Sequence, residues 1–181
     1  MDTGKFFHQK RIKLLAIDVT VLTISDRSSR GERDDLSGPA LCQAVHQLGW
    51  SLVSYSVLPD DFSAIREFLL TQSQSGKVNL ILTTGGTGFS PRDVTPEATL
   101  SVVEKRTPGL VEKIRLESSV KNPNAILFRA EAGIYKKALI LNLPGSPNGA
   151  VESFLIVASV LPHALSVLKG SSESESSHKG Q

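Results

Sequence analysis

The chain has 181 residues, of which 40% are hydrophobic and 21% are charged, proportions that fit one globular domain with a substantial core. The formal net charge of +2 is too close to neutral to favour a nucleic acid or an acidic membrane surface as the partner. The single cysteine, Cys42, excludes an intrachain disulfide, and this low cysteine content agrees with a reducing compartment. We therefore expect a cytoplasmic protein.

Two terminal segments are expected to lie outside the folded domain. Residues 1–16 form a basic extension that leads into a short apolar stretch, which stops at Asp18 and is too short for a signal peptide. Residues 171–181 contain no apolar side chain and predict a disordered tail. No stretch approaches the length of a membrane-spanning helix. The folded domain is therefore expected to cover residues 17–170.

The first half of this domain predicts strands that alternate with helices. β-branched and apolar residues indicate a strand at residues 17–24, and further strands are expected at residues 52–58 and 79–83. Between the first two strands, Ser37 is expected to cap a helix with one apolar face, which Gly49 ends. A second helix, marked by apolar residues at helical spacing, precedes the third strand.

The second half predicts two helical stretches, a hairpin and a long last helix. A helix with proline in its first turn begins near Pro96, and another is expected at residues 110–118, after a Pro-Gly break. Residues 127–134 and 138–143 predict the two strands of the hairpin. Residues 151–168 predict the last helix, which has apolar residues on most of its faces.

This alternation predicts an α/β fold with three layers, in which helices cover both faces of a mainly parallel sheet. The hairpin implies at least one antiparallel strand. Sheets of this kind bind ligands at the carboxyl ends of their strands. Four polar segments follow predicted strand ends and would share that edge: residues 25–27, 59–61, 84–93 and 142–147.

The glycine-rich segment at residues 84–93, TGGTGFSPRD, is the most informative part of the sequence. It lies between a predicted strand and a helix start, which is typical of an anion site because glycines bring backbone N–H groups close to a phosphate. Hydroxyl donors come from Thr84, Thr87 and Ser90, and Arg92 adds a positive charge. The segment matches neither a Walker loop nor the dinucleotide fingerprint. The alternative is a tight turn whose glycines only relieve strain.

Two aspartates at the same predicted edge indicate a divalent cation. Asp93 would repel a phosphate bound by the glycine-rich segment unless a cation lay between them, which suggests magnesium and a nucleotide. Asp60 follows the second predicted strand and has two interpretations. It is either a cap of the next helix, together with Asp61, or a second ligand of the same ion. The presence of Asp93 favours the metal.

Two further segments bring polar groups to this edge. Asp26 and Arg27 form either a salt-bridged loop or a contact with a substrate. Residues 142–147 contain two prolines around a glycine and predict a rigid turn before the last helix. The backbone N–H groups of Gly145 and Ser146 in this turn would suit a second ligand group.

Residues 84–99, TGGTGFSPRDVTPEAT, resemble the signature of the molybdopterin adenylyltransferase family. That family includes bacterial molybdenum-cofactor enzymes, one domain of the plant cofactor enzyme and one domain of gephyrin. The resemblance is far more specific than one short motif, because it covers about residues 19–170 in order. It includes four more segments: residues 23–27, 35–39, 57–60 and 142–147.

The resemblance implies a molybdopterin-binding fold and an enzyme in which the phosphate of molybdopterin attacks the α-phosphate of ATP. The products would be adenylyl-molybdopterin and pyrophosphate, and metal insertion would follow on another protein. The resemblance also implies ATP as co-substrate and a Mg²⁺ ion held by Asp60 and Asp93, the implied catalytic residues. The substrate-binding residues that it implies are Ser25, Asp26, Thr84, Gly85, Gly86, Thr87, Gly88, Ser90, Asn142, Pro144, Gly145 and Ser146.

Members of this family are usually trimers, and the apolar last helix or the hairpin would suit the interface, although a buried helix has the same pattern. The presence of Asp60 favours the active branch over a sister branch that can lack this aspartate. The hairpin turn at residues 135–137, Tyr-Lys-Lys, departs from a more usual Arg-Gly pair. Two alternatives stay open. One is a non-catalytic molybdopterin-binding or scaffold module of the same fold, and the other is a flavodoxin-like nucleotide-binding protein, which fits the α/β pattern but not these loops.

Overall fold

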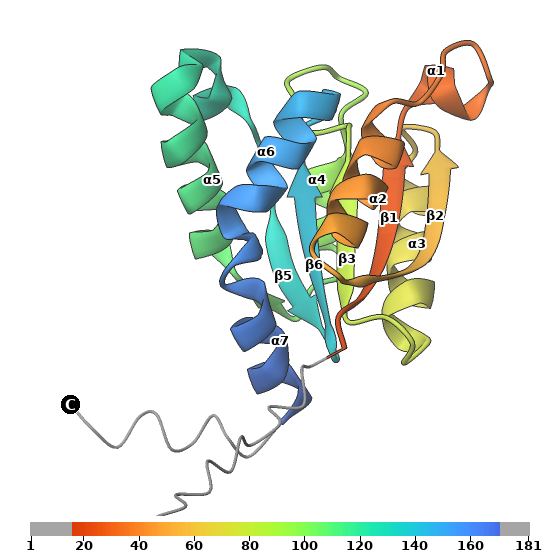
Figure 1. Cartoon of the computed structure of the whole chain (residues 1–181). Coiled ribbons are helices and arrows are strands. Elements are labelled where there is room, and N and C mark those ends of the chain that lie inside the picture. Colours follow the sequence, from red (N-terminus) through yellow and green to blue (C-terminus); the bar gives the residue numbers. More distant parts are fainter. Residues whose placement is uncertain (1–15, 171–181) are drawn as a thin grey trace, which may run out of the picture.

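The computed structural model describes residues 16–170 of the chain. The predicted basic extension, except for Ala16, and the predicted tail at residues 171–181 lie outside the described residues. One six-stranded sheet lies between two layers of helices, which confirms the predicted three-layer α/β fold (Figure 1). The first and last described segments meet, because Lys169 Nζ donates a hydrogen bond to the carbonyl of Ala16 (3.1 Å).

The sheet is mainly parallel, as predicted. Its strands lie in the order β2 (Ser51–Leu58), β1 (Asp18–Ile24), β3 (Leu80–Thr84), β6 (Ala138–Leu143), β5 (Ala132–Tyr135) and β4 (Lys105–Arg106). β1 pairs in parallel with β2 and β3, and β3 pairs in parallel with β6. β5 is antiparallel to both β6 and β4, so the predicted hairpin is confirmed. The sequence did not predict the two-residue edge strand β4.

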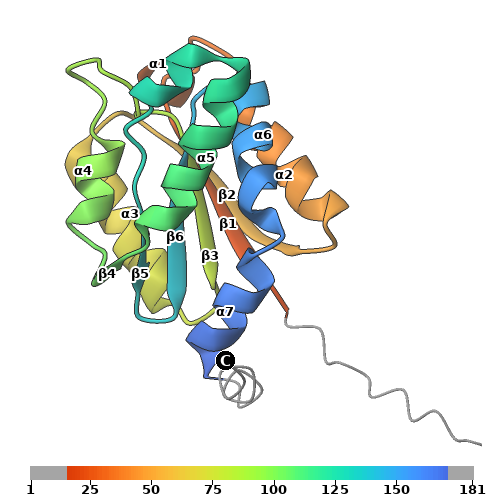
Figure 2. The ribbon, with the colours of Figure 1, turned by 90° about the vertical axis from the view of Figure 1, so that its left-hand side faces the viewer.

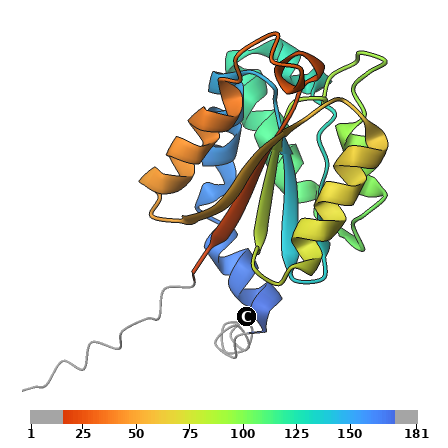
Figure 3. The ribbon, with the colours of Figure 1, turned by 90° about the vertical axis from the view of Figure 1, so that its right-hand side faces the viewer.

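Helices cover both faces of the sheet (Figures 2 and 3). One face carries α2 (Ser37–Gln47), α5 (Pro108–Lys121), α6 (Pro147–Ala158) and α7 (Leu161–Lys169). The opposite face carries α3 (Phe62–Gln74) and α4 (Thr95–Leu100). Two short helices lie near the carboxyl ends of the parallel strands: α1 (Asp26–Ser29) and the 3₁₀ helix η1 (Pro123–Leu127).

The central strands are buried on both faces, which explains their continuous apolar sequence. In β3, Leu80 and Leu82 belong to the core that contains residues of α2, α5, α6 and α7, whereas Ile81 belongs to the core that contains residues of α3 and α4. All three side chains are fully buried. This alternation follows from the two-residue period of a strand.

The predicted last helix at residues 151–168 is in fact two helices. α6 ends at Ala158 and α7 begins at Leu161, and the pair is bent by 63°. Pro162 explains the break, because it has no N–H to donate to the Ala158 carbonyl and its ring would crowd that oxygen. Within residues 16–170, no single helix is long and apolar enough to cross a membrane, and the bent pair reaches that length and composition only when both helices are counted together.

Two smaller differences concern a helix start and a strand start. α2 begins at Ser37, but the cap is not the serine side chain. The Asp35 carboxylate accepts the N–H groups of Ser37 (2.9 Å) and Gly38 (3.2 Å) instead. The strand predicted at residues 127–134 begins only at Ala132, because its first residue ends η1.

Candidate active site

The loops at the carboxyl ends of the parallel strands meet, as the sequence predicted. The loop after β1 is joined to the end of β2 by a hydrogen bond from Ser25 N to Leu58 O (2.9 Å). The segment at residues 84–93, here called the glycine loop, follows β3. It is joined to the loop after β6 because Thr84 Oγ1 donates to Pro144 O (2.6 Å). The predicted polar segments therefore form one continuous edge.

The glycine loop requires its first two glycines. Gly85 and Gly86 have φ angles of 101° and 61°, in the left-handed region that favours glycine. A Cβ on Gly85 would lie 2.1 Å from the carbonyl oxygen of Ile24. A Cβ on Gly86 would lie 2.3 Å from Thr95 Oγ1 and 3.0 Å from Asp60 Oδ1. The loop therefore passes directly over the end of β1 and beside the carboxylate of Asp60.

Asp60 is available to the site because its neighbour caps the helix. Asp61 Oδ1 accepts the N–H of Ala64 in the first turn of α3 (2.8 Å). Asp60 and Asp26 instead exchange hydrogen bonds, each carboxylate accepting the other residue's N–H (2.9 and 3.1 Å). Burial raises the pKa of Asp60 above its usual value, and the negative charges of Asp26 and Asp93 raise it further. A bound cation would relieve this repulsion.

Asp93 is the last residue of the glycine loop, and its carboxylate lies against Gly88. A Cβ on Gly88 would lie 2.8 Å from Asp93 Oδ2, which also accepts the N–H of Ser90 (3.0 Å). Arg92, predicted to add charge to a phosphate site, is paired with Asp26 through two hydrogen bonds (3.0 and 3.1 Å). This guanidinium lowers the pKa of Asp26. Asp26 is therefore salt-bridged, and its partner is not the adjacent arginine that the sequence suggested.

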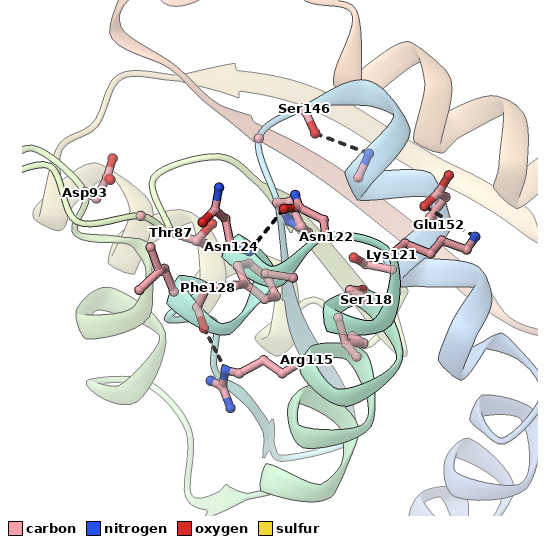
Figure 4. A pocket seen from close by; sticks show the side chains of 18 of the residues that line it. Thr87, Asp93, Arg115, Ser118, Lys121, Asn122, Asn124, Phe128, Ser146 and Glu152 are labelled. Atoms are coloured by element: carbon pink, nitrogen blue, oxygen red, sulfur yellow. Dashed lines mark hydrogen bonds and ion pairs between the residues drawn. The ribbon is translucent and has the colours of Figure 1, made fainter.

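Two adjoining cavities lie beside the glycine loop. The smaller one, about 230 Å³, is bounded by the loops that follow β1, β2 and β3 and by the start of α2. The larger one, about 510 Å³, lies between the glycine loop, α5, η1 and α6 (Figure 4). Gly86, Asp93 and Gly145 line both cavities. Two ligands, one in each cavity, would therefore meet at these three residues.

Several residues of the larger cavity are absent from the sequence-based prediction. Figure 4 shows Asp93 on the glycine-loop side and the ion pair between Lys121 and Glu152 (4.0 Å) on the opposite side. The turn at residues 122–124, Asn-Pro-Asn, is the signal that could have indicated this wall, because it predicts polar groups at the end of a helix. The unpredicted lining residues include Arg115, Ser118, Lys121, Asn122, Asn124, Phe128 and Glu152.

Most of the predicted substrate-binding residues line one of these cavities. Ser25, Thr84 and Gly85 line the smaller one with Asp60. The larger one is lined by Gly86, Thr87, Gly88, Pro144, Gly145 and Ser146. The Ser146 side chain also caps α6, because its Oγ accepts the N–H of Gly149 (3.2 Å).

Three predicted residues are not brought to either cavity. Asp26 is held in the ion pair with Arg92, and Ser90 lines a separate open groove on the outer side of the glycine loop. Asn142 is fully buried, and its amide nitrogen donates to the hydroxyls of Thr83 and Thr99 (both 2.9 Å). The Asn142 side chain therefore connects β6, β3 and α4 inside the core.

Asp60 and Asp93 fit the chemistry of a Mg²⁺ site, because this ion is commonly held by one or two carboxylates together with water and substrate phosphates. Both carboxylates lie against the glycine loop, Asp60 near Gly86 and Asp93 near Gly88. Within residues 16–170, no group of three or more His, Cys, Asp and Glu side chains is arranged to hold a metal ion. Phosphate and water oxygens would complete the coordination.

Comparison with known proteins places these features in one family. The family model described as a probable molybdopterin binding domain matches residues 20–163. A molybdopterin adenylyltransferase of Helicobacter pylori is 38% identical over 156 residues, which are 85% of this chain and 89% of the relative. The Escherichia coli protein of the same name is 39% identical over 137 residues, which are 75% of this chain and 70% of the relative.

Solved structures agree. The molybdopterin biosynthesis enzyme MoaB of Thermus thermophilus has a TM-score of 0.81 and 44% identity, covering 85% of this chain and 97% of that protein. A structure of MogA has a TM-score of 0.79 and 36% identity, covering 83% of this chain and 99% of that protein. A longer relative, the molybdenum cofactor synthesis protein cinnamon of Drosophila melanogaster, is 41% identical over 154 residues, only 26% of its length.

Proposed function

This chain belongs to the molybdopterin-binding domain family, and we propose that it adenylylates molybdopterin, with Mg-ATP as the second substrate, in molybdenum cofactor biosynthesis. The phosphate oxygen of molybdopterin attacks the α-phosphorus of ATP. The bond from that phosphorus to the β-phosphate oxygen breaks, and pyrophosphate leaves. The observation that carries the proposal is that two cavities meet at Gly86, Asp93 and Gly145, beside the carboxylate of Asp60.

The chain's own groups supply positioning and charge for this reaction, the two contributions that phosphoryl transfer needs most. Backbone N–H groups of Gly86, where the two cavities join, and of Gly88, in the larger cavity, bind phosphate oxygens, and Gly145 approaches the junction from the loop after β6. Asp60 and Asp93 would hold Mg²⁺, and the ion would supply positive charge to offset the charge on the reacting phosphates.

The direct test is incubation of the protein with molybdopterin, ATP and MgCl₂. We expect adenylyl-molybdopterin and one equivalent of pyrophosphate, both absent when ATP is replaced by an analogue that cannot be cleaved between the α- and β-phosphates. A non-catalytic binding or scaffold module of the same fold would bind molybdopterin without releasing pyrophosphate. That result, under conditions in which an active relative turns over, would contradict the proposal.

The proposed product requires an acceptor. We propose that a separate molybdenum-insertion protein takes adenylyl-molybdopterin from this enzyme, in the cytoplasm. Residues 17–170 would be the catalytic unit, since both cavities lie within them. Co-purification of the product with the enzyme, and its release when such an acceptor is added, would support this order of events.

A further inference from the structure

A single arginine, Arg129, connects a distant segment to the glycine loop. It lies in the stretch between η1 and β5, which the sequence-based prediction of the site did not include. Its Nε donates to the carbonyl oxygen of Gly88 (2.6 Å), and its Nη2 donates to the carbonyl oxygen of Asp93 (2.7 Å). Its backbone N–H donates to the carbonyl oxygen of Thr87 (3.0 Å), and its Nη1 pairs with Glu97 of α4.

These bonds hold the middle of the glycine loop, between its base and its tip. The base of the loop is held by Thr95, whose N–H donates to Gly86 O (3.1 Å) and whose hydroxyl donates to Gly85 O (2.9 Å). The tip is closed on itself, because Asp93 N donates to Ser90 O (2.9 Å). Between the base and the tip, Arg129 joins the segment that enters the tip, at Gly88, to the segment that leaves it, at Asp93. The exposed tip, residues 89–92, has its own link to the loop after β1, the ion pair between Arg92 and Asp26.

The chemistry of the bridge requires an arginine. A guanidinium is planar and donates in two fixed directions, so one side chain can bind two carbonyl oxygens at once, whereas a lysine ammonium is a compact point donor. The position of Arg129 is fixed in turn by Arg115 of α5. Arg115 donates to the carbonyl oxygens of Phe128 (2.7 Å) and Ala130 (3.0 Å), on either side of Arg129.

We propose that Arg129 is a positioning residue that holds the glycine loop closed so that the Asp93 carboxylate stays directed at the reacting phosphates. The proposal rests on the proposed function, because Asp93 is the residue through which Arg129 acts. The guanidinium donates hydrogen bonds to the main chain on both sides of the loop tip, at Gly88 and at Asp93 itself. Loss of these bonds frees the Asp93 carboxylate to move, and displacements of about 1 Å in such sites reduce rates by about a hundredfold.

The test compares Arg129→Ala and Arg129→Lys with the matched control Arg106→Ala. Arg106 also makes a bidentate bond, to the carboxylate of Glu131 (both 2.9 Å), but it lies on β4 and touches neither the glycine loop nor the two cavities. The first readout is amide hydrogen exchange in the peptide that covers residues 88–95. We expect exchange there to be about tenfold faster or more in both Arg129 variants and unchanged in the control, because local opening follows the loss of local bonds.

The second readout is turnover. Both Arg129 variants should lose ~10–100-fold in kcat, with the KM for molybdopterin changed less than threefold, because the binding cavities stay intact. Millimolar guanidinium should restore part of the activity of Arg129→Ala and none in Arg129→Lys, where the lysine fills the space. The lysine variant retains the charge beside Glu97, so it keeps the test valid if the alanine variant does not fold.

Each result decides the proposal. If amide exchange in residues 88–95 of both Arg129 variants equals that of the wild type, Arg129 does not hold the glycine loop, whatever the turnover. A kcat within twofold of wild type in both Arg129 variants also overturns the proposal. If the Arg129 variants exchange faster but the wild-type protein shows no adenylyl transfer, the proposed function is overturned. The role of Arg129 in holding the glycine loop is then still supported. A loss of kcat in the Arg106 control equal to that in the Arg129 variants assigns the effect to general stability and overturns the proposal.

Discussion

Asp60 and Asp61 are adjacent in sequence, yet the structure gives them different surroundings. Asp61 caps α3, whereas Asp60 faces the glycine loop. We therefore expect Asp60→Asn and Asp93→Asn each to reduce adenylyl transfer by about a hundredfold, or ~3 kcal/mol, because each would remove a charge from the proposed metal site. Molybdopterin binding should persist, since the proposed contacts to that substrate come from backbone N–H groups and hydroxyls.

The matched control for this prediction is Asp61→Asn, which removes a neighbouring charge but keeps a side chain that caps helices well. Turnover and molybdopterin affinity should be measured for all three variants, with circular dichroism to check the fold. Near wild-type turnover in the Asp60 and Asp93 variants would contradict a role for these two residues in binding the metal. Equal losses in all three variants would indicate a general charge effect.

Asp35 provides a prediction about stability and pH. Burial opposes ionisation of this carboxyl, but polar contacts with Thr23, with Tyr55 and with the first turn of α2 outweigh it and hold its pKa below the ordinary value of 3.8. A carboxyl with a lowered pKa stabilises the fold above its unfolded pKa, and this stabilisation is lost as the pH falls through the folded value. Asp35→Ala should therefore reduce the free energy of unfolding at pH 7 by about 1–2 kcal/mol, as loss of a cap does.

The difference between wild type and Asp35→Ala should narrow as the pH is lowered below 3.8, which urea unfolding at several pH values would measure. The exposed neighbour Asp34 is the control, and Asp34→Ala should change the free energy of unfolding by less than about 0.5 kcal/mol. A difference that is constant across this pH range would show that the charge of Asp35 is not the stabilising feature.

For single residues, the sequence predicted which polar residues lie at the sheet edge better than it predicted where each side chain points. It placed Asp60 and Asp93 at one edge, and both lie beside the glycine loop. It also expected Asn142 at the substrate, although this side chain lies in the core. The hydroxyls that bind Asn142 belong to Thr83 and Thr99, which are distant in sequence, so no local pattern could reveal them.

Among the elements, the glycine loop has the strictest backbone requirement. Gly85→Ala would place a Cβ 2.1 Å from a backbone oxygen at a φ of 101°, so the loop must shift. We expect a loss of about 2 kcal/mol or more in the free energy of unfolding, together with a large loss of turnover. Gly109→Ala is the control, because its Cβ would meet nothing within 4 Å in the first turn of α5.

The control variant should be more stable than wild type by about 0.5–1 kcal/mol, since alanine favours a helix over glycine. Thermal unfolding of both variants, with turnover measured at a temperature where both are folded, tests this contrast. A Gly85→Ala protein with wild-type stability and activity would show that the glycine loop has room to shift.

The elements that sequence reasoning predicted well are those whose pattern is local. β1, β3 and β6 were predictable because strands buried on both faces form apolar runs. β4 consists of Lys105 and Arg106, and only its pairing with Gly133 and Ile134 makes it a strand, which is a non-local interaction. The break between α6 and α7 has a local signal in Pro162, but the apolar pattern continues across it and hides the break.

For the whole molecule, we expect a homotrimer at micromolar concentration. Large apolar side chains of α5 and η1 are exposed: Leu116 (70%), Val120 (86%) and Ile126 (70%). Leu116 and Val120 are four residues apart and share a helix face. Exposed apolar clusters of this kind indicate contact with another chain. Light scattering that gives the mass of a monomer would contradict this prediction.

The position of the interface is testable separately. The double variant Leu116→Glu, Val120→Glu should be monomeric, whereas Val53→Glu, which places a charge on the edge strand β2, should stay trimeric. The sequence favoured the last helix or the hairpin instead, and Leu155 on α6 is also exposed. Dissociation by Leu155→Glu, without dissociation by the α5 variant, would assign the interface to α6.

The hydrogen bond between Lys169 and Ala16 has a consequence for how this fold is used in larger proteins. Chain entry and chain exit lie side by side, at the end of the sheet opposite the glycine loop (Figure 1). If this fold were inserted into a longer protein, the chain could enter it and leave it at nearly the same point, away from both cavities. Such a geometry suits insertion of the unit into a longer chain, and the longer relative from Drosophila melanogaster matches this chain over only 26% of its own length.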